Sequence, residues 1–282
     1  MEITSPALLP EREPVRVQSL ASGSSGNAYL IQSGSSTVLI DCGIGIRELQ
    51  RFLASWEITA DELAGVLITH EHGDHVRSLD QLLRRGAPVY TTHGTADALG
   101  LAHDRYVRIW WSQPFTVGSL DVTPIQTSHD AAEPCGLMIQ TSGIGIAVIT
   151  DLGETTPATA EFASHADLLI LESNHCHHML RSGPYPAHLK RRVASNVGHL
   201  SNDQCAELVC GVSTRDTGPS HVWLAHLSAT NNSARVASEA TERQLMSCGA
   251  QPIVSVLPRG RPGPLWTGDA ARARQLRMSI DI

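Results

Sequence analysis

Aromatic side chains are scarce in this sequence of 282 residues, at 4%, and acidic residues outnumber basic ones, with a formal net charge of −7. Few aromatics argue against an extended surface that stacks single-stranded bases. The negative balance excludes a basic surface over the whole molecule that would hold nucleic acid without specificity. No apolar stretch approaches the about eighteen residues that a membrane-spanning helix needs, and residues 1–14 lack the apolar core of a signal peptide. We therefore expect no membrane segment.

Cysteines are also few and lack the spacing of a metal-binding knuckle. None forms a C-x-x-C pair, so a structural zinc site built on cysteine is not expected. A disulfide framework is not expected in so long a chain, and we predict reduced thiols in a cytoplasmic protein. The six cysteines are Cys42, Cys135, Cys176, Cys205, Cys210 and Cys248.

The remaining composition is that of a folded protein, with 41% hydrophobic and 17% charged residues. Such a chain is long enough to bury a sizeable core. We predict one domain over residues 15–257, preceded by an N-terminal extension, 1–14, and followed by a C-terminal tail, 258–282. The tail is rich in Gly, Pro and Arg, so we expect it to be loosely held.

Alternating or continuous apolar runs predict strands, and apolar residues at helical spacing predict helices. The mixture predicts an α/β fold in which two packed sheets are flanked by helices. The expected strands are 15–20, 28–31, 37–40, 65–69, 88–91, 105–110, 120–126, 136–140, 144–150, 168–172, 221–225 and 253–257. The expected helices are 47–55, 79–85, 186–196, 202–212 and 233–248.

Polar residues stand at the carboxyl ends of four of these predicted strands. They are Asp41, His70, Asp151 and His226. In α/β architectures the chemistry lies at strand ends, beside the apolar strands. The pattern predicts that residues far apart in the sequence form one site.

The run Thr69–His75 reads T-H-E-H-G-D-H and places four metal-ligand side chains within six residues, at His70, His72, Asp74 and His75. In a loop after a strand, His70 and His72 can serve one ion while Asp74 and His75 face a neighbouring one. Nitrogen and carboxylate ligands suit zinc or manganese. The alternative is a set of surface histidines without a ligand role.

Two adjacent ions need a bridging anion and further ligands. Asp151 is suited to the bridge, and His129 and His226 can complete the two sets. The sequence therefore predicts two divalent metal ions, zinc or manganese, as cofactors. Such a pair makes hydroxide available near neutral pH and neutralises charge on a phosphodiester.

These residues resemble the motifs of the metallo-β-lactamase superfamily, in order along the chain. Asp41 matches the first motif, the run from His70 to His75 the second, His129 the third, Asp151 the fourth and His226 the fifth. The resemblance spans residues 15 to about 257 and implies a four-layer αββα sandwich with a dinuclear site at one edge of the sheets.

A narrower resemblance is carried by four segments: S-L-A-S-G-S-S-G-N at 19–27, S-H-D-A-A-E-P at 128–134, T-D-L-G at 150–153 and G-H-L-S-N at 198–202. Together they are similar to the YycJ/WalJ group. That similarity implies DNA exonuclease activity and a relation to RNase Z-like nucleases.

Several further residues are candidates for catalysis. Asp74 is expected both to bind metal and to orient the attacking hydroxide. Asp41 is expected to fix a ligand histidine through a hydrogen bond, although it could instead be a turn or cap residue. His199 could donate a proton to the leaving oxygen or bind phosphate; the alternative is a histidine in the loop that caps the next helix.

Substrate contacts are predicted from three segments. The glycine-rich loop with Ser24, Ser25 and Asn27 can cradle phosphate with its backbone N–H groups, or be a plain tight turn. Asn174 and His175 follow an apolar strand and could face the substrate. A basic run at 190–192, of which we select Lys190 and Arg191, can hold a nucleic-acid backbone or be a solvated helix face.

The leading functional prediction is a metal-dependent phosphodiesterase that acts on DNA, and its exonuclease detail depends on the resemblance. The alternative is a small-molecule hydrolase on the same site, cleaving a lactone, a β-lactam, a thioester or a cyclic phosphodiester. A binding protein without activity is disfavoured because every expected ligand is present. A homodimer is possible.

Overall fold

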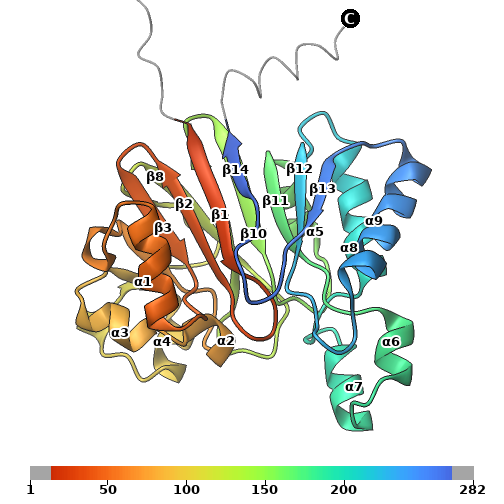
Figure 1. Cartoon of the computed structure of the whole chain (residues 1–282), viewed down its shortest axis with the longest axis horizontal. Helices are drawn as coiled ribbons and strands as arrows, with labels where there is room; N and C mark the ends of the chain where they lie inside the picture. The colour runs from red at the N-terminus through yellow and green to blue at the C-terminus, as the bar shows by residue number, and fades with distance from the viewer. Residues whose placement is uncertain (1–13, 269–282) are drawn as a thin grey trace, which may run out of the picture.

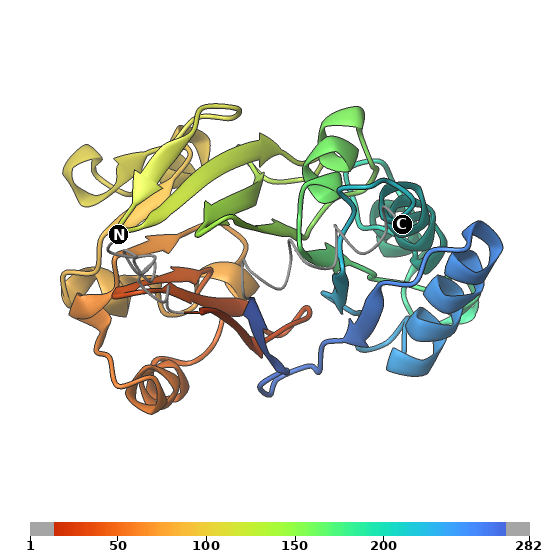
Figure 2. The same cartoon turned by 90° about the horizontal axis from the view of Figure 1, so that it is seen from above.

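Two seven-stranded sheets pack face to face in the computed structural model of the protein, which describes residues 14–268 (Figure 1). Helices cover both outer faces, as the view from above shows (Figure 2). The predicted four-layer αββα sandwich is confirmed. None of the helices in residues 14–268 has the length and apolar character to span a bilayer.

The strands are β1 (Val15–Ala21), β2 (Ala28–Ser33), β3 (Ser36–Ile40), β4 (Gly65–Leu67), β5 (Val89–Thr91), β6 (Val107–Arg108), β7 (Phe115–Val117), β8 (Leu120–Gln126), β9 (Cys135–Thr141), β10 (Ile144–Ile149), β11 (Leu168–Glu172), β12 (His221–Ala225), β13 (Ile253–Val256) and β14 (Leu265–Gly268). The helices are α1 (Ile46–Ser55), α2 (Gly73–Val76), α3 (Leu79–Arg84), α4 (His93–Ala98), α5 (Pro157–Ser164), α6 (His177–Ser182), α7 (Ala187–Val193), α8 (Asn202–Ser213) and α9 (Ala234–Cys248), with 3-10 turns η1 (Ala60–Glu62) and η2 (His103–Arg105).

The strands β1 to β6, joined by the last strand β14, build one sheet in the order β14-β1-β2-β3-β4-β5-β6, and β7 to β13 build the other, β13-β12-β11-β10-β9-β8-β7. Each sheet is part antiparallel and part parallel. The strands β3 to β6 run parallel, and so do β10 to β13. Parallel neighbours bring their carboxyl ends to one edge, so residues that follow β3 and β4, or β10, β11 and β12, meet there.

Three apolar clusters hold the layers together. The central one lies between the sheets and includes Ile31, Val38, Leu137 and Trp223. A second packs α5, α8 and α9 onto the second sheet, and a third packs α1 and α3 onto the first. Strands buried on both faces read as continuous apolar runs, and β10 and β11 are buried along their whole length.

The structure contains elements that were not predicted, among them β7, α4, α5 and α6, and it differs from two of the expectations that were made. The expected strand at 105–110 is reduced to β6, an edge strand that pairs only along Val107 and Arg108, because residues 103–105 form η2. The tail expected to be loose after 258 contains β14, which pairs antiparallel with β1 and buries Trp266. That expectation is wrong for residues 265–268. Residues 1–13 of the predicted extension and 269–282 of the tail lie outside the described residues.

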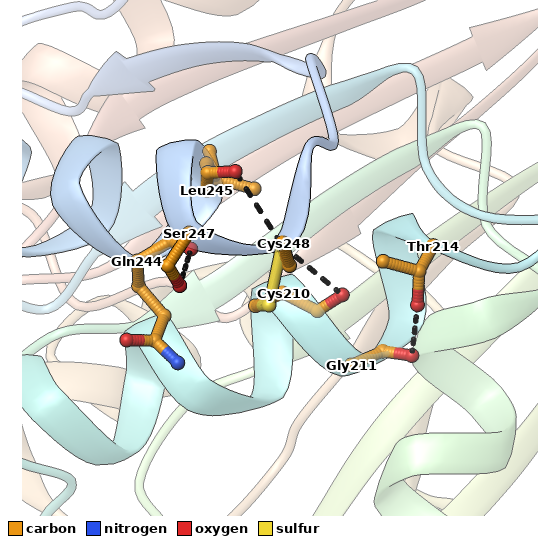
Figure 3. Close-up of a disulfide and its surroundings, with 7 residues drawn as sticks. All are labelled: Cys210, Gly211, Thr214, Gln244, Leu245, Ser247 and Cys248. Carbon is orange, nitrogen blue, oxygen red and sulfur yellow. Dashed lines mark hydrogen bonds between the residues drawn. A yellow bond between two sulfur atoms is a disulfide. The ribbon is translucent and has the colours of Figure 1, made fainter.

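The expectation that all six cysteines are reduced is also wrong. Cys210 on α8 and Cys248 at the end of α9 form a disulfide across the two helices, with Cα atoms 6.3 Å apart (Figure 3). The other four cysteines are free thiols. The pairing could not be predicted from cysteine spacing, because 38 residues separate the two cysteines and only the packing of α8 against α9 brings them together.

Candidate metal centre

The strand-end residues meet at one edge of the sandwich, as the sequence predicted. Asp41 follows β3 and His70 lies three residues beyond β4, while Asp151 and His226 follow β10 and β12. A third strand end, Glu172 of β11, lies between the latter two. Their side chains form a buried polar cluster beside the apolar core.

A first group of possible ligands comprises His70, His72 and His129, whose ring nitrogens lie within 4.8 Å of one another. His129 donates from Nδ1 to the backbone oxygen of Gly198 at 2.9 Å. Its other nitrogen, Nε2, lies 3.3 Å from Nδ1 of His72. The bond to Gly198 thus aims Nε2 of His129 at the shared centre.

A second group comprises Asp74, His75 and His226. Oδ2 of Asp74 lies 3.8 Å from Nε2 of His75 and 3.4 Å from Nε2 of His226. Asp74 is held from behind by the glycine-rich loop, because its backbone oxygen accepts a 2.8 Å hydrogen bond from the N–H of Asn27. A Cβ on Gly43 would lie 1.7 Å from that oxygen, so only glycine permits this close approach.

Asp151 lies between the two groups. Its Oδ2 is 3.2 Å from Nε2 of His75, and its Oδ1 is 3.7 Å from Nε2 of His129. Oδ2 of Asp151 and Nε2 of His70 are buried and have no hydrogen-bond partner among residues 14–268. Buried polar atoms are normally satisfied. These orphaned atoms, with nitrogen and carboxylate donors around them, fit a metal centre.

Two buried carboxylates orient the histidines from outside the cluster. Oδ2 of Asp41 accepts a 2.7 Å hydrogen bond from Nδ1 of His75, while Thr69 donates to the same carboxylate from its N–H and its hydroxyl. Oε1 of Glu172 accepts from Nδ1 of His226 at 2.7 Å and from Nδ1 of His199 at 2.8 Å. The bonds to His75 and His226 leave the Nε2 atoms of these two imidazoles facing Asp74.

The carboxylates dominate the electrostatics of the second group. Burial alone would lower the pKa of His75, but Asp151 and Asp41 raise it to about 10. Burial alone would also lower the pKa of His226, but Asp151 and Glu172 raise it well above its usual value. The pKa of Glu172, which burial would raise, is held at about 2 by His199 and His226. This excess of buried negative charge requires positive charge nearby, as protons or as a cation.

The first group has the opposite balance. Burial lowers the pKa of His70 well below its usual value, and the neighbouring His75 adds to the effect. Burial also lowers the pKa of His129. Neutral imidazoles are the form that binds metal, so these two histidines are ready to act as ligands at neutral pH.

The backbone at three of the strand ends is strained. Asp41, Asp151 and His226 have φ values of 55°, 58° and 54°, in the left-handed region. Residues with side chains adopt it at a cost of roughly 1–3 kcal/mol, and such strain gathers at functional sites. The turn after each strand therefore directs a polar side chain into the centre at the expense of stability.

A cavity of about 220 Å³ opens onto the centre. Several candidate residues line it: Asp74, Asp151, His72, His199 and His226 from the centre, with Ser24 and Asn174 among the predicted substrate contacts. Its remaining walls are Tyr185, Leu189, Arg192, Val193, Ser228 and Asn231.

Other predicted substrate residues lie elsewhere. Asn27 is buried and contacts the ligand loop, with its Nδ2 3.1 Å from Nε2 of His75, so it positions ligands. Ser25 is exposed and outside the cavity lining. His175 is buried away from that lining, and both its ring nitrogens lack a hydrogen-bond partner in the described part of the chain.

In the basic run at 190–192, the residues that we expected to contact the substrate do not line the cavity. Lys190 donates to the backbone oxygen of Arg181 at 2.8 Å, and neither it nor Arg191 lines the cavity. Arg192 does, and its Nε donates to the carboxylate of Asp130. The face of α7 that turns inward was not evident from three consecutive basic residues.

Sequence reasoning missed Glu172, Thr69 and Arg192 as parts of the site. Glu172 was counted only as the last residue of an apolar strand. An acidic residue at the end of an apolar strand, between strands that are followed by Asp151 and His226, was the available signal, because a buried carboxylate needs hydrogen-bond partners.

Comparison with known proteins agrees with this geometry. Residues 36–223 match the Beta-lactamase superfamily domain. The chain is 33% identical to the exodeoxyribonuclease YycJ of Bacillus anthracis over 82% of this chain and 89% of that protein. It is 32% identical to the exodeoxyribonuclease WalJ of Streptococcus pneumoniae serotype 2, over 80% and 86%.

Among solved structures, the metallo-β-lactamase fold protein YhfI of Bacillus subtilis superposes with a TM-score of 0.68 at 19% identity, covering 90% of this chain and 99% of that one. This likeness concerns the fold. The chain belongs to the metallo-β-lactamase superfamily. Within it, the protein is a hydrolase similar to the YycJ and WalJ exonucleases, with His and Asp clusters able to bind metal.

Proposed function

We propose that the protein is a phosphodiesterase that uses two divalent metal ions, zinc or manganese, and degrades DNA as an exonuclease. The observation that carries the proposal is the position of Asp151 between the two groups of ligands, with Oδ2 3.2 Å from Nε2 of His75 and Oδ1 3.7 Å from Nε2 of His129. The DNA substrate is supported by the similarity to YycJ and WalJ, both named exodeoxyribonucleases.

One ion would be held by His70, His72 and His129, and the other by Asp74, His75 and His226, with Asp151 shared between them. When bound, such a pair supplies a nucleophile from water at neutral pH and positive charge for the phosphodiester oxygens. The protein's own residues then position the reactants.

Asp74 reaches both His75 and His226 and lines the cavity, so it orients the attacking water as well as binding metal. Asp41 and Glu172 keep the Nδ1 protons on His75 and His226, which leaves their Nε2 atoms as ligands.

His199 donates a proton to the leaving oxygen. It lines the cavity, and its Nδ1 bonds Glu172 at 2.8 Å, which directs Nε2 outward. Burial would lower the pKa of His199, but Glu172 raises it above its usual value, which favours the protonated form that a general acid needs. The glycine-rich loop supports this chemistry indirectly, because its N–H of Asn27 is used to hold Asp74.

A small-molecule hydrolase is the second candidate. The cavity of about 220 Å³ is smaller than that of typical drug-sized ligand sites, and the net charge of −7 does not attract polyanions. Both observations favour a compact substrate such as a lactone, β-lactam, thioester or cyclic phosphodiester.

One assay panel separates the two. Metal-loaded protein is given end-labelled single- and double-stranded DNA, RNA, a chromogenic phosphodiester, a lactone and a β-lactam. The proposal expects stepwise shortening of DNA that is lost in Asp74→Ala. Intact DNA with turnover of the lactone would instead establish the second candidate. A cytoplasmic location and a homodimer stay predictions, which fractionation and light scattering can test.

A further inference from the structure

A pair of short helices forms one wall of the cavity at its mouth. We call α6, α7 and the linking residues 183–186 the cap. It projects from the body of the molecule at the lower right of Figure 1 and lies in the chain between β11 and α8. Four of its residues, Tyr185, Leu189, Arg192 and Val193, line the cavity that holds the metal centre.

The cap brings one positive charge to the cavity. Arg192 is the one lysine or arginine among the described residues that line it. Its side chain is 49% exposed, and its Nε donates to Asp130, whose Oδ1 lies 3.5 Å from Nε2 of His129. The ion pair fixes the guanidinium beside the metal centre while leaving part of it open to solvent. A planar guanidinium held in this way is suited to a phosphate.

The cap also brings an aromatic ring and closes against a buried amide. Tyr185 is half-buried at the cavity wall. Asn231 is fully buried beneath the cap, and its backbone oxygen accepts a 2.9 Å hydrogen bond from the N–H of Cys176 at the start of α6. Its Oδ1 faces Gly183 of the cap, where an added Cβ would lie 2.8 Å from it, so only glycine permits this close packing.

We propose that the cap forms a nucleotide subsite beside the metal centre. Arg192 binds the phosphate next to the scissile one, and Tyr185 stacks on the base. The subsite deepens the proposed phosphodiesterase function and rests on it.

The test compares Arg192→Gln with Arg191→Gln, a neighbouring arginine on α7 that is exposed and outside the cavity lining. The substrates are an end-labelled single-stranded oligonucleotide and bis(p-nitrophenyl) phosphate, which carries no nucleotide. Arg192→Gln should raise the KM for the oligonucleotide about 10- to 100-fold, as for one charge-assisted hydrogen bond. The slope of log KM against log salt should fall by about 0.7, as for one lost phosphate contact.

In the same variant, the metal content and the kcat on the small phosphodiester should stay at wild-type values. In Arg191→Gln, the KM and kcat on both substrates should stay at wild-type values. Tyr185→Ala should raise the KM for the oligonucleotide by roughly 5- to 100-fold through lost stacking, without changing the salt slope. Arg192→Lys should restore the salt slope, because it restores the charge.

Three results would overturn the subsite. Equal effects of Arg192→Gln and Arg191→Gln on the oligonucleotide would reduce the effect to surface charge. A matching loss on the small phosphodiester would show that Arg192 acts only through Asp130 on the metal centre. An unchanged oligonucleotide KM would remove Arg192 from binding. Failure of the wild-type protein to cleave either phosphodiester is a separate result, which overturns the proposed function itself.

Discussion

The floor of the cavity and the cap are built in opposite ways. The floor consists of buried residues, among them Asp151 and His226 at strand ends and His75 on α2, and carboxylates fix both histidines. The cap consists of helices of six and seven residues whose side chains are largely exposed. Helices so short have little stability of their own. We infer that the floor fixes the chemistry and the cap selects what reaches it.

The largest effect is expected at Asp151, the proposed shared ligand of the two ions. Replacing Asp151 with Ala should remove metal from the floor and lower phosphodiester hydrolysis roughly a thousandfold or more, because the electrostatic stabilisation of the transition state is lost. Metal analysis and initial rates measure both effects. Full metal content and an undiminished rate in a folded Asp151→Ala protein would show that the floor does not depend on this carboxylate.

His199 lies where the chain leaves the cap and returns to the floor. In His199→Ala the single-turnover rate should fall about 100- to 10,000-fold while the metal content remains intact, as for loss of a general acid. His178→Ala is the matched control, because His178 is exposed on α6. A rate that stays the same in His199→Ala would remove this residue from the mechanism.

Glu172 tests the orientation of the floor. Glu172→Gln loses the negative charge that His199 and His226 share, so we expect metal affinity or kcat to fall about 10- to 100-fold. Glu207→Gln, an exposed glutamate on α8, serves as the control. Equal behaviour of the two variants would contradict the positioning role of Glu172.

His175 gives the smallest expected effect and acts on stability. Burial, with His177 nearby, lowers its pKa to about 4, so below its unfolded pKa of about 6.5 the unfolded chain binds more protons. Because of this residue, the free energy of unfolding should therefore fall by about 1 kcal/mol as the pH is lowered from 7 to 5.5. Urea unfolding should show a smaller loss in His175→Asn than in wild type or the exposed control His177→Asn. An identical pH dependence in all three would refute the assignment.

The floor could be predicted from the sequence more fully than the cap. The floor could be predicted because each predicted ligand follows an apolar strand, and the carboxyl ends of neighbouring parallel strands must meet. Glu172 was missed because it ends such a strand without a motif of its own. The cap could not be predicted, because the packing of α7 decides which residue of the run Lys190, Arg191 and Arg192 faces the cavity.

Long-range pairings account for the remaining differences. β14 forms in a segment rich in Gly, Pro and Arg because the open edge of β1 offers hydrogen bonds there. The pairing of Cys210 with Cys248 depends on the packing of two helices. Neither carries a local pattern, so periodicity alone could not reveal them.

A metal titration of the chelator-stripped protein tests the central claim most directly. Manganese or zinc is added stepwise while binding and the shortening of an end-labelled single strand are followed together. The account predicts two ions per chain, with DNA shortening appearing as the second ion binds and absent throughout in Asp151→Ala. Full activity with one ion, or without any, would contradict it.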